Sequence, residues 1–319
     1  MFNLINIDLQ LFADLNTQTT GASSLSPEMK TYYSDYLIDC ALPKLVHDQF
    51  GQKHPIPKNG GKIIEFRKYS PLPKLDKVTL TEGITPDGQS LEVTTINAEV
   101  KQYGGYITLS DVLLLTAIDN NMVQATKLLG NQAGATLDTI TRDVLNGGTN
   151  VIYAGGVDGT DAVSAVLTVD DVKKAVRALK AQNAEKIDNA FVGIIHPDVS
   201  YDLTNDPKWE AVKTYDPEDW YEGEIGRIFG VRFVETTEAK IKANGNYCTL
   251  ILGDNAYGVT EIEGGGLEHI VKQLGSGGTA DPLNQRATVG WKATKVAERL
   301  VEQFMVRIES KSSFNGAAN

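Results

Sequence analysis

Three observations predict an α+β fold for this chain. They are a long strand pair with a polar tip, one long stretch of helical periodicity, and a later part in which short strands and helices alternate. The 319 residues suit one large or two medium domains, and the 41% hydrophobic content is typical of a globular protein with a core. No internal repeat is visible, so the fold has to be inferred from the order of the predicted elements.

The N-terminal part is predicted to hold a polar arm followed by a short helical region. Residues 1–25 form the arm, in which Phe12 lies in a brief apolar run and is a candidate subunit contact. Residues 26–57 form the helical region, because Ser26 is a suitable N-cap and Pro27 suits the first helical position. Pro43 is expected to break or kink that helix.

Residues 58–111 are predicted to form a protruding β-hairpin. Its legs are residues 62–69 and 91–100, and proline and glycine residues mark the tip between them. A leg of roughly 15 to 20 residues would span about 50–65 Å, whereas a compact body of this size would be about 50 Å across. Because an isolated two-stranded ribbon is marginally stable in water, we expect the hairpin to lie against another copy of the chain.

The two legs of the predicted hairpin differ in charge. Residues 58–80 carry six basic and two acidic residues, whereas residues 81–100 carry four acidic residues and no basic one. Opposite charges could attract across the ribbon or between neighbouring subunits, or they could only keep a solvated hairpin from aggregating. The candidate contact residues are Lys62, Arg67, Lys68, Lys74, Lys77, Glu82, Asp87 and Glu92.

A long amphipathic helix and an α/β domain are predicted after the hairpin. The helix covers residues 119–146 within a region, 112–167, that begins the next part of the fold, and it would extend about 42 Å. Residues 168–260 form the α/β domain, which opens with a capping box at Thr168. Residues 261–319 are expected to return as strands to the part that begins within residues 112–167, and to end the chain. The strands expected in these two regions are 190–195, which a turn at 196–198 ends, 232–235, 248–252 and 301–308.

An acidic, aromatic stretch interrupts the α/β domain. Residues 206–226 hold seven acidic residues against two lysines, with Trp209 and Trp220 among the interleaved aromatic residues. The stretch is either an ordered surface loop with aromatic anchors or a subunit contact, since Trp and Tyr are enriched at interfaces.

Signals for catalysis, cofactors and metals are missing from the sequence. There is no Walker A motif, no paired histidine motif and no CxxC pair, so we expect no enzyme activity, no catalytic residues, no cofactor and no metal site. The net charge of −11 argues against general nucleic-acid binding, which needs clustered basic residues. No apolar run is long enough to span a membrane, and no signal peptide is evident.

The order of these elements resembles the major capsid proteins of tailed phages, the Hong Kong 97 fold. Individual stretches are similar to the coat-protein family of the N-four-like phages, and the resemblance covers nearly the whole chain. The stretches that carry it are 9–13 (LQLFA), 81–88 (TEGITPDG), 100–104 (VKQYG) with 109–111 (LSD), 223–226 (GEIG), and 281–285 (DPLNQ) with 290–292 (GWK).

The resemblance implies a structural protein of the virion. It assigns the roles of N-terminal arm, extended loop, spine helix, axial domain and peripheral domain to the regions above, with the return strands completing the peripheral domain. Subunits would form hexamers and pentamers in an icosahedral shell around double-stranded DNA, after assembly in the host cytoplasm. The implied partners are a separate scaffolding protein, since only about 25 residues precede the first helix, a portal, and DNA bound without sequence specificity. The alternative is another phage structural protein, such as a head decoration or tail component.

Overall fold

The computed structural model describes eight ranges of the chain and three isolated residues, of which residue 72 is one. These are 45–55, 62–69, 72, 88–116, 121–209, 227–260, 267–278, 281–314 and 316–319, with Leu37 and Cys40, and for Lys68 and Tyr69 only the backbone is described. The predicted N-terminal arm, the expected helix start at Ser26 and the hairpin tip lie outside the described residues.

The described elements include both helices and strands, with most of the strands in long runs, which confirms the α+β prediction. The helices are α2 (Asp111–Thr116), α3 (Asn121–Asn146), α4 (Val169–Ala181) and α5 (Pro197–Thr204). The strands are β1 (Gln52–His54), β2 (Ile63–Tyr69), β3 (Val93–Glu99), β4 (Lys101–Ser110), β5 (Val151–Tyr153), β6 (Phe191–Ile195), β7 (Arg227–Ile228), β8 (Val231–Glu235), β9 (Tyr247–Leu252), β10 (Tyr257–Thr260), β11 (Leu267–Lys272), β12 (Arg286–Lys295), β13 (Ala297–Arg299) and β14 (Met305–Ser310).

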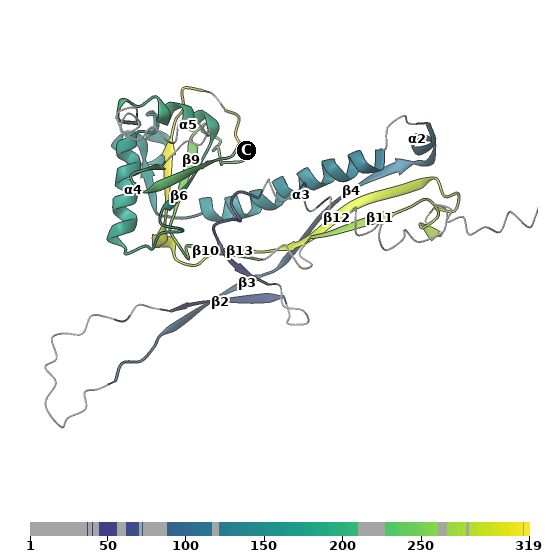
Figure 1. Ribbon diagram of the computed structural model, residues 1–319, viewed down its shortest axis with the longest axis horizontal. Coiled ribbons are helices and arrows are strands. Elements are labelled where there is room, and N and C mark those ends of the chain that lie inside the picture. Colours follow the sequence, from purple (N-terminus) through teal and green to yellow (C-terminus); the bar gives the residue numbers. More distant parts are fainter. Residues whose placement is uncertain are drawn as a thin grey trace, which may run out of the picture.

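Three parts of the molecule extend in different directions (Figure 1). A globular part, here called the body, contains a six-stranded sheet in the order β5-β14-β9-β6-β8-β7 with α4 and α5. A second part, the extension, contains α2, α3 and a three-stranded sheet in the order β11-β12-β4. The hairpin of β2 and β3 projects from beneath the junction of the other two, so the molecule is elongated and branched.

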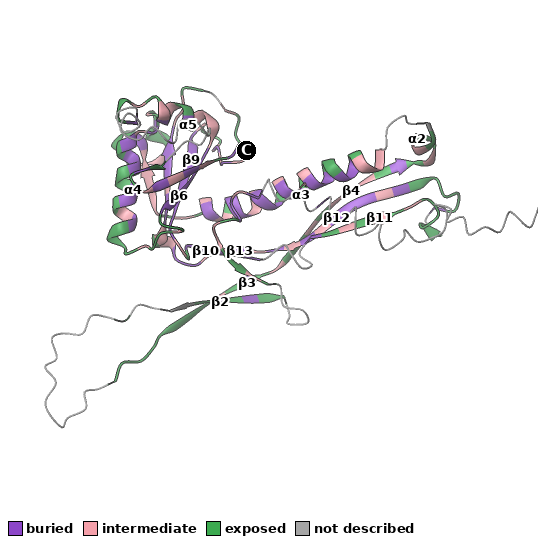
Figure 2. Ribbon diagram, in the orientation of Figure 1, coloured by how far each residue is buried: buried purple, intermediate pink, exposed green. Residues whose placement is uncertain are grey.

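The body sheet is covered on both faces. Phe191 and Ile195 of β6 pack in one apolar cluster with Val172 and Leu179 of α4. Val192 and Ile194, the alternate residues of the same strand, pack in a second cluster that also contains Leu145, near the end of α3, and strand residues Leu250, Tyr257 and Met305. This double burial explains the nearly continuous apolar sequence of β6. Figure 2 shows that buried residues fill β6 and β9.

The extension has one covered and one open sheet face. Leu129, Ala133 and Leu137 of α3 pack on Val289 and Trp291 of β12. Helix α3 accommodates the N-terminal segment at Gly130, where a Cβ atom would lie 2.8 Å from the Leu37 carbonyl oxygen. The predicted long helix is therefore confirmed, and tertiary contacts account for a glycine that would otherwise weaken it.

The hairpin is confirmed, but it is shorter than predicted. Strands β2 and β3 pair antiparallel from Ile63 opposite Glu99 to Tyr69 opposite Val93. The prediction that the ribbon continues to residue 111 is wrong, because β4 pairs along its whole length with β12 and joins the extension. The base of the hairpin also packs within its own chain, since Ile64, Phe66 and Ala98 form a buried cluster with Leu300 and Val301.

Two further predictions in the body need correction. The expected turn at 196–198 is the start of α5, where the His196 ring nitrogen accepts a hydrogen bond from the Asp198 backbone N–H and Pro197 occupies the first helical turn. The prediction that the strands of residues 261–319 all join one part of the molecule is wrong. Strands β11 and β12 lie in the extension, whereas β14 pairs with β9 and β5 in the body. The capping box at Thr168 is confirmed, since its side chain accepts a hydrogen bond from the Asp171 N–H.

Candidate subunit interfaces

The hairpin presents an exposed face that carries predicted contact residues. Lys62, Arg67 and Glu92 are exposed, and no ion pair joins any of the three to another residue in the described part of the chain. Ile63 and Val93 are 55% and 45% exposed on the same ribbon. The hairpin therefore offers both charge and apolar area to a partner, while its other face packs on its own chain.

The pairing of residues in the hairpin tests whether its opposite charges attract each other across the ribbon. Along the paired strands, Glu65 lies opposite Asn97, Arg67 opposite Thr95 and Lys68 opposite Thr94. No basic residue faces an acidic one in the described pairs, so attraction across the ribbon is not what holds this part together. The interpretation that the charges act between subunits stays a prediction, as does the one in which they only solvate the hairpin.

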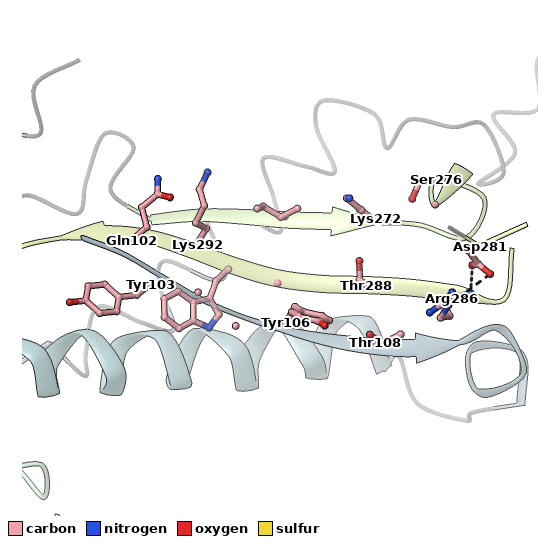
Figure 3. Close-up of a pocket in the computed structure, with 16 residues that line it drawn as sticks. Gln102, Tyr103, Tyr106, Thr108, Lys272, Ser276, Asp281, Arg286, Thr288 and Lys292 are labelled. Carbon is pink, nitrogen blue, oxygen red and sulfur yellow. Dashed lines mark hydrogen bonds and ion pairs between the residues drawn. The ribbon is translucent and has the colours of Figure 1, made fainter. Parts of the chain in front are cut away.

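A second exposed surface is the open face of the three-stranded sheet, on the side away from α3. Tyr106 of β4 is opposite Gly290 of β12, and Gly290 is in turn opposite Ile270 of β11. Tyr106 is 76% exposed and Ile270 41% exposed. Tyr106, Gly290 and Ile270 thus form a row across the three strands. Since Gly290 has no side chain, this row forms an apolar notch at the middle of the sheet. Polar residues continue along both sides of the notch (Figure 3).

Charged and polar groups border the notch. Lys292 pairs with Glu268 at 2.9 Å on the neighbouring row of the open face. At one end of the sheet, the Asp281 carboxylate accepts hydrogen bonds from the backbone N–H groups of Gln285 and Arg286. Lys292, Asp281 and Arg286 line one hollow of about 720 Å³ together with the residues of the notch. An apolar centre with a polar rim is the usual composition of a protein–protein interface.

Exposed apolar side chains also gather on the two helices of the extension. Val112 and Leu115 of α2 are 63% and 86% exposed, and Leu128 of α3 is 62% exposed. Helix α2 lies at the far end of the extension from the body (Figure 1). The extension thus carries unburied apolar side chains on its helices as well as on its sheet.

A buried polar joint holds the 45–50 segment against α3 and β12 of the extension. Asp138 of α3 accepts hydrogen bonds from the His47 backbone N–H and lies 2.7 Å from the His47 ring Nδ1. Lys295 Nζ of β12 lies 2.5 Å from Asp48 Oδ2, and Thr141 donates to the other oxygen of the same carboxylate. Burial lowers the pKa of the Lys295 amine, and the Asp48 carboxylate partly offsets this.

The predicted contact residues fall into three groups in the structure. Lys62, Arg67, Lys68 and Glu92 belong to the described hairpin. Trp209 is a correction: it is only 3% exposed and packs inside the body, with its ring 6.1 Å from that of Phe233, so it serves as an anchor and not as a subunit contact. Outside the described residues lie Phe12, Lys74, Lys77, Glu82, Asp87 and Trp220.

The sequence predictions missed Tyr106, Ile270 and the buried joint. The alternation of Tyr103, Ile107 and Leu109 with the polar residues Gln102, Thr108 and Ser110 was a usable sequence signal for Tyr106, because it predicts a strand with one open face. The joint had no such signal, since its members are separated by up to 247 residues.

Among the described residues, no group of three or more His, Cys, Asp or Glu side chains is placed to hold a metal ion. No helix in the part of the chain that the structure describes is both long and apolar enough to cross a membrane.

Comparison with protein families gives one match. The model of a family described as phage capsid protein matches residues 92–304, about two thirds of the chain. This range includes α3, all three strands of the extension sheet and every strand of the body sheet except β14. A search of curated proteins finds no match.

Solved phage capsids share the fold. The capsid of Ralstonia phage GP4 is similar with a TM-score of 0.68 and 12% identity, over 99% of this chain and 100% of that chain. The capsid of cyanophage Pam1 gives 0.65 and 13% over 98% and 100%, and that of cyanophage P-SCSP1u gives 0.64 and 15% over 94% of each chain. At these identities the likeness concerns the fold, and it extends over both the body and the extension.

Proposed function

The chain belongs to the phage capsid protein family, and we propose that it is the subunit that builds an icosahedral head around double-stranded DNA. It is a structural protein of the virion. In the proposed shell, subunits are grouped as hexamers and pentamers. The alternative of a head decoration or tail component has less in its favour, because both the family match and the similar structures are capsid proteins.

The proposed roles of the parts follow the Hong Kong 97 arrangement. The hairpin is the extended loop, α3 is the spine helix, the three-stranded sheet belongs to the peripheral domain, and the body is the axial domain. Residues 1–25 are proposed as the N-terminal arm that attaches to a neighbour through Phe12. A separate scaffolding protein and a portal are the proposed partners during assembly in the host cytoplasm, and DNA is the proposed content of the finished shell.

The observation that carries the proposal is the pair of one-sided surfaces on a single chain. The hairpin exposes Arg67 and Ile63 on one face, and the three-stranded sheet exposes Tyr106 and Ile270 on its open face. Two different surfaces on one subunit allow a heterologous contact, in which each copy uses one surface to bind the previous copy and the other to bind the next. A closed ring of subunits forms when repeated rotations from one copy to the next add up to a full turn.

The proposed contacts on the hairpin are its charged residues, Lys62, Arg67, Lys68, Lys74, Lys77, Glu82, Asp87 and Glu92. Trp220 is a further proposed contact. Each exposed ion pair contributes only about 0–1 kcal/mol. A shell repeats every contact many times, so weak contacts still produce a stable assembly. The net charge of −11 fits a subunit that encloses DNA without binding it tightly.

The decisive experiment removes the hairpin tip, residues 74–88. The hairpin base packs on Leu300 and Val301, so we expect the thermal transition of the isolated subunit to change little while shell formation is lost. Assembly is followed by sedimentation and negative-stain electron microscopy, with scaffolding protein added where one is available. Shells of normal size from the shortened chain would contradict the proposed role of the hairpin, and a wild-type chain that stays monomeric under every assembly condition would contradict the proposed function.

A second variant tests the charges alone. Changing Lys74 and Lys77 to Glu reverses two charges on the basic leg and leaves the chain length unchanged. We expect slower assembly whose dependence on salt concentration is weaker than in the wild type, because screening acts on the charge contacts. Changing Lys173 and Lys174 on the exposed face of α4 to Glu is the matched control and should leave the assembly rate unchanged.

A further inference from the structure

Lys295 and Asp48 form a charged pair that is almost completely removed from water. The Lys295 side chain is 0% exposed and that of Asp48 10% exposed. Nζ lies 2.5 Å from Asp48 Oδ2 and 2.7 Å from the Leu137 carbonyl oxygen. Removing two charges from water is costly, and the attraction between them repays that cost only in favourable geometry. A reaction that removes both charges is therefore favoured at this position.

We propose that Lys295 and Asp48 condense to form an amide bond within the subunit. The new carbon–nitrogen bond joins Lys295 Nζ to Asp48 Cγ. Asp48 Oδ2 leaves as water, and the two protons in that water come from the ammonium group. Nothing is oxidised or reduced and no second reactant is needed, so the folded chain contains everything that the reaction requires.

The surroundings of Lys295 favour the reactive, neutral form of its amine. A lysine becomes a nucleophile when burial lowers its pKa, because the ammonium form is then less favoured. Burial is the largest influence on Lys295 and lowers its pKa, while the carboxylates of Asp48 and Asp138 act in the opposite direction. Transfer of one proton from Nζ to Asp48 gives a neutral amine beside a carboxylic acid, which is the pair that condenses.

The surroundings of Asp48 favour attack on its carboxyl carbon. Thr141 Oγ1 donates a hydrogen bond to Asp48 Oδ1 at 2.5 Å. Oδ1 is the oxygen that gains negative charge when the amine attacks, so this donor stabilises the tetrahedral intermediate. The Thr141 hydroxyl comes from α3, which also supplies the Leu137 carbonyl that holds the amine. One turn of one helix thus contacts both reacting groups.

A second buried carboxylate fixes the backbone next to Asp48. Asp138 is 0% exposed and binds His47 through both the backbone N–H and the ring Nδ1. His47 precedes Asp48, so this pair of contacts, together with the hydrogen bond from the Tyr257 hydroxyl to the His47 carbonyl oxygen, holds Asp48 in place. Asp138 is a positioning residue. Groups held in this way reach effective concentrations of about 10⁵–10⁸ M in model reactions, which offsets the tendency of water to hydrolyse an amide.

The bond would change the mechanics of the joint. It would connect residue 48 to the end of β12 and lock α3 between them, so the 45–50 segment could not separate from the extension even in denaturant. This inference does not depend on the proposed shell, because the reaction needs only one folded chain.

The mass of the purified chain under denaturing conditions tests the proposal directly. We expect it to be lower than the sequence mass by one water molecule. After digestion with trypsin, a branched peptide should join the segments that contain residues 48 and 295, with no cleavage after Lys295. A chain with the full sequence mass, or with the water loss located elsewhere, would show that Lys295 and Asp48 form only a buried ion pair.

Three variants locate the reaction. Lys295→Arg keeps a positive charge but has no amine that can condense, so it should show the full mass. Asp48→Asn should lose ammonia in place of water, since the amide nitrogen becomes the leaving group. Lys292→Arg is the control. Lys292 lies on the same strand, its side chain is partly exposed to solvent, and it forms an ion pair with Glu268 at 2.9 Å. This variant should still lose one water molecule. Should a variant fail to fold, the wild-type mass alone decides.

Discussion

The body and the extension differ in how many faces of their sheets are buried. Every residue of β6 and β9 in the body is buried. In the extension, β4 alternates between exposed residues and half-buried or buried ones, because α3 covers only one face of its sheet. Figure 2 shows the same contrast, with buried residues concentrated in the body and on the inner side of α3. The single chain thus completes the body, whereas it leaves the extension and the hairpin with surfaces that suit partners.

The largest expected effect of a substitution lies in the body core. Phe191 is 1% exposed and packs against residues of α4, so Phe191→Ala should lower the free energy of unfolding by about 3–5 kcal/mol. Denaturant titration of the isolated subunit measures this loss. Tyr201→Ala, at a position 56% exposed on α5, is the control and should cost less than about 1 kcal/mol. Equal losses at the two positions would contradict the division between a closed core and its surface.

A substitution on the covered face of the extension sheet should lower the free energy of unfolding by nearly as much. Trp291 is 4% exposed, packs on α3 and donates to Gln132 at 3.3 Å. We expect Trp291→Ala to lower the free energy of unfolding by about 3 kcal/mol. If thermal melting shows no loss, α3 is not held by this sheet, and the extension is stabilised in another way.

A buried carboxylate in the body should produce a measurable dependence on pH. Glu309 is 0% exposed and accepts hydrogen bonds from Lys242 and Arg307 at 2.6 and 3.0 Å. Its pKa is lowered: burial alone would raise it, but the hydrogen bonds from Lys242 and Thr160 outweigh burial. Since the folded pKa lies below the unfolded value of about 4.3, this contribution to stability is present above pH 4.3 and is lost as pH falls through the folded pKa.

The variant Glu309→Gln isolates that contribution. It should cost about 1–3 kcal/mol at neutral pH, because two cations lose their charged partner. Unfolding measured between pH 7 and pH 3 should then show a weaker loss of stability in acid than the wild type does. The same acid dependence in both proteins would assign the effect to other carboxylates.

A substitution on the open face of the extension sheet should impair assembly and leave the stability of the subunit nearly unchanged. Tyr106→Ala removes a side chain that is 76% exposed, so the free energy of unfolding should change by less than about 1 kcal/mol. Assembly should nevertheless be strongly reduced when followed by light scattering, because the side chain is proposed to be buried between subunits. Normal assembly of this variant would remove the open face from the proposed interfaces.

The smallest effect on stability is expected on the hairpin. Arg67→Ala should change the free energy of unfolding by less than about 0.5 kcal/mol, since Arg67 is exposed and makes no ion pair with any other described residue. Its assembly rate at low salt should fall, and the difference from the wild type should disappear at high salt. Lys173→Ala on α4 serves as the control that leaves assembly unchanged.

Local patterns in the sequence were sufficient to predict two of the helices and several of the strands. The helical spacing that predicts 119–146 corresponds to α3, Asn121–Asn146, and the capping box at Thr168 precedes α4. The buried strand expected at 190–195 corresponds to β6, Phe191–Ile195. These predictions succeed because side-chain periodicity and helix capping depend on residues within a few positions of one another.

The error at residues 196–198 also has a local cause. His-Pro after a strand favours a turn, and the same residues are equally suited to begin a helix, with His196 as the N-cap and Pro197 in the first turn. The sequence pattern is ambiguous between the two, and the packing of Val199 and Leu203 in the body core selects the helix.

The sequence by itself determined the α+β class, the long helix, the two legs of the hairpin and the resemblance to capsid proteins. Only the tertiary structure decided which strands pair and which side chains meet. Tyr106 acquires its partner Gly290 and the open face only when β4 leaves the hairpin for β12. Lys295 meets Asp48 across 247 residues. Such contacts depend on the packing of the whole chain, because distant segments are brought together by shared burial and not by any local preference of the backbone.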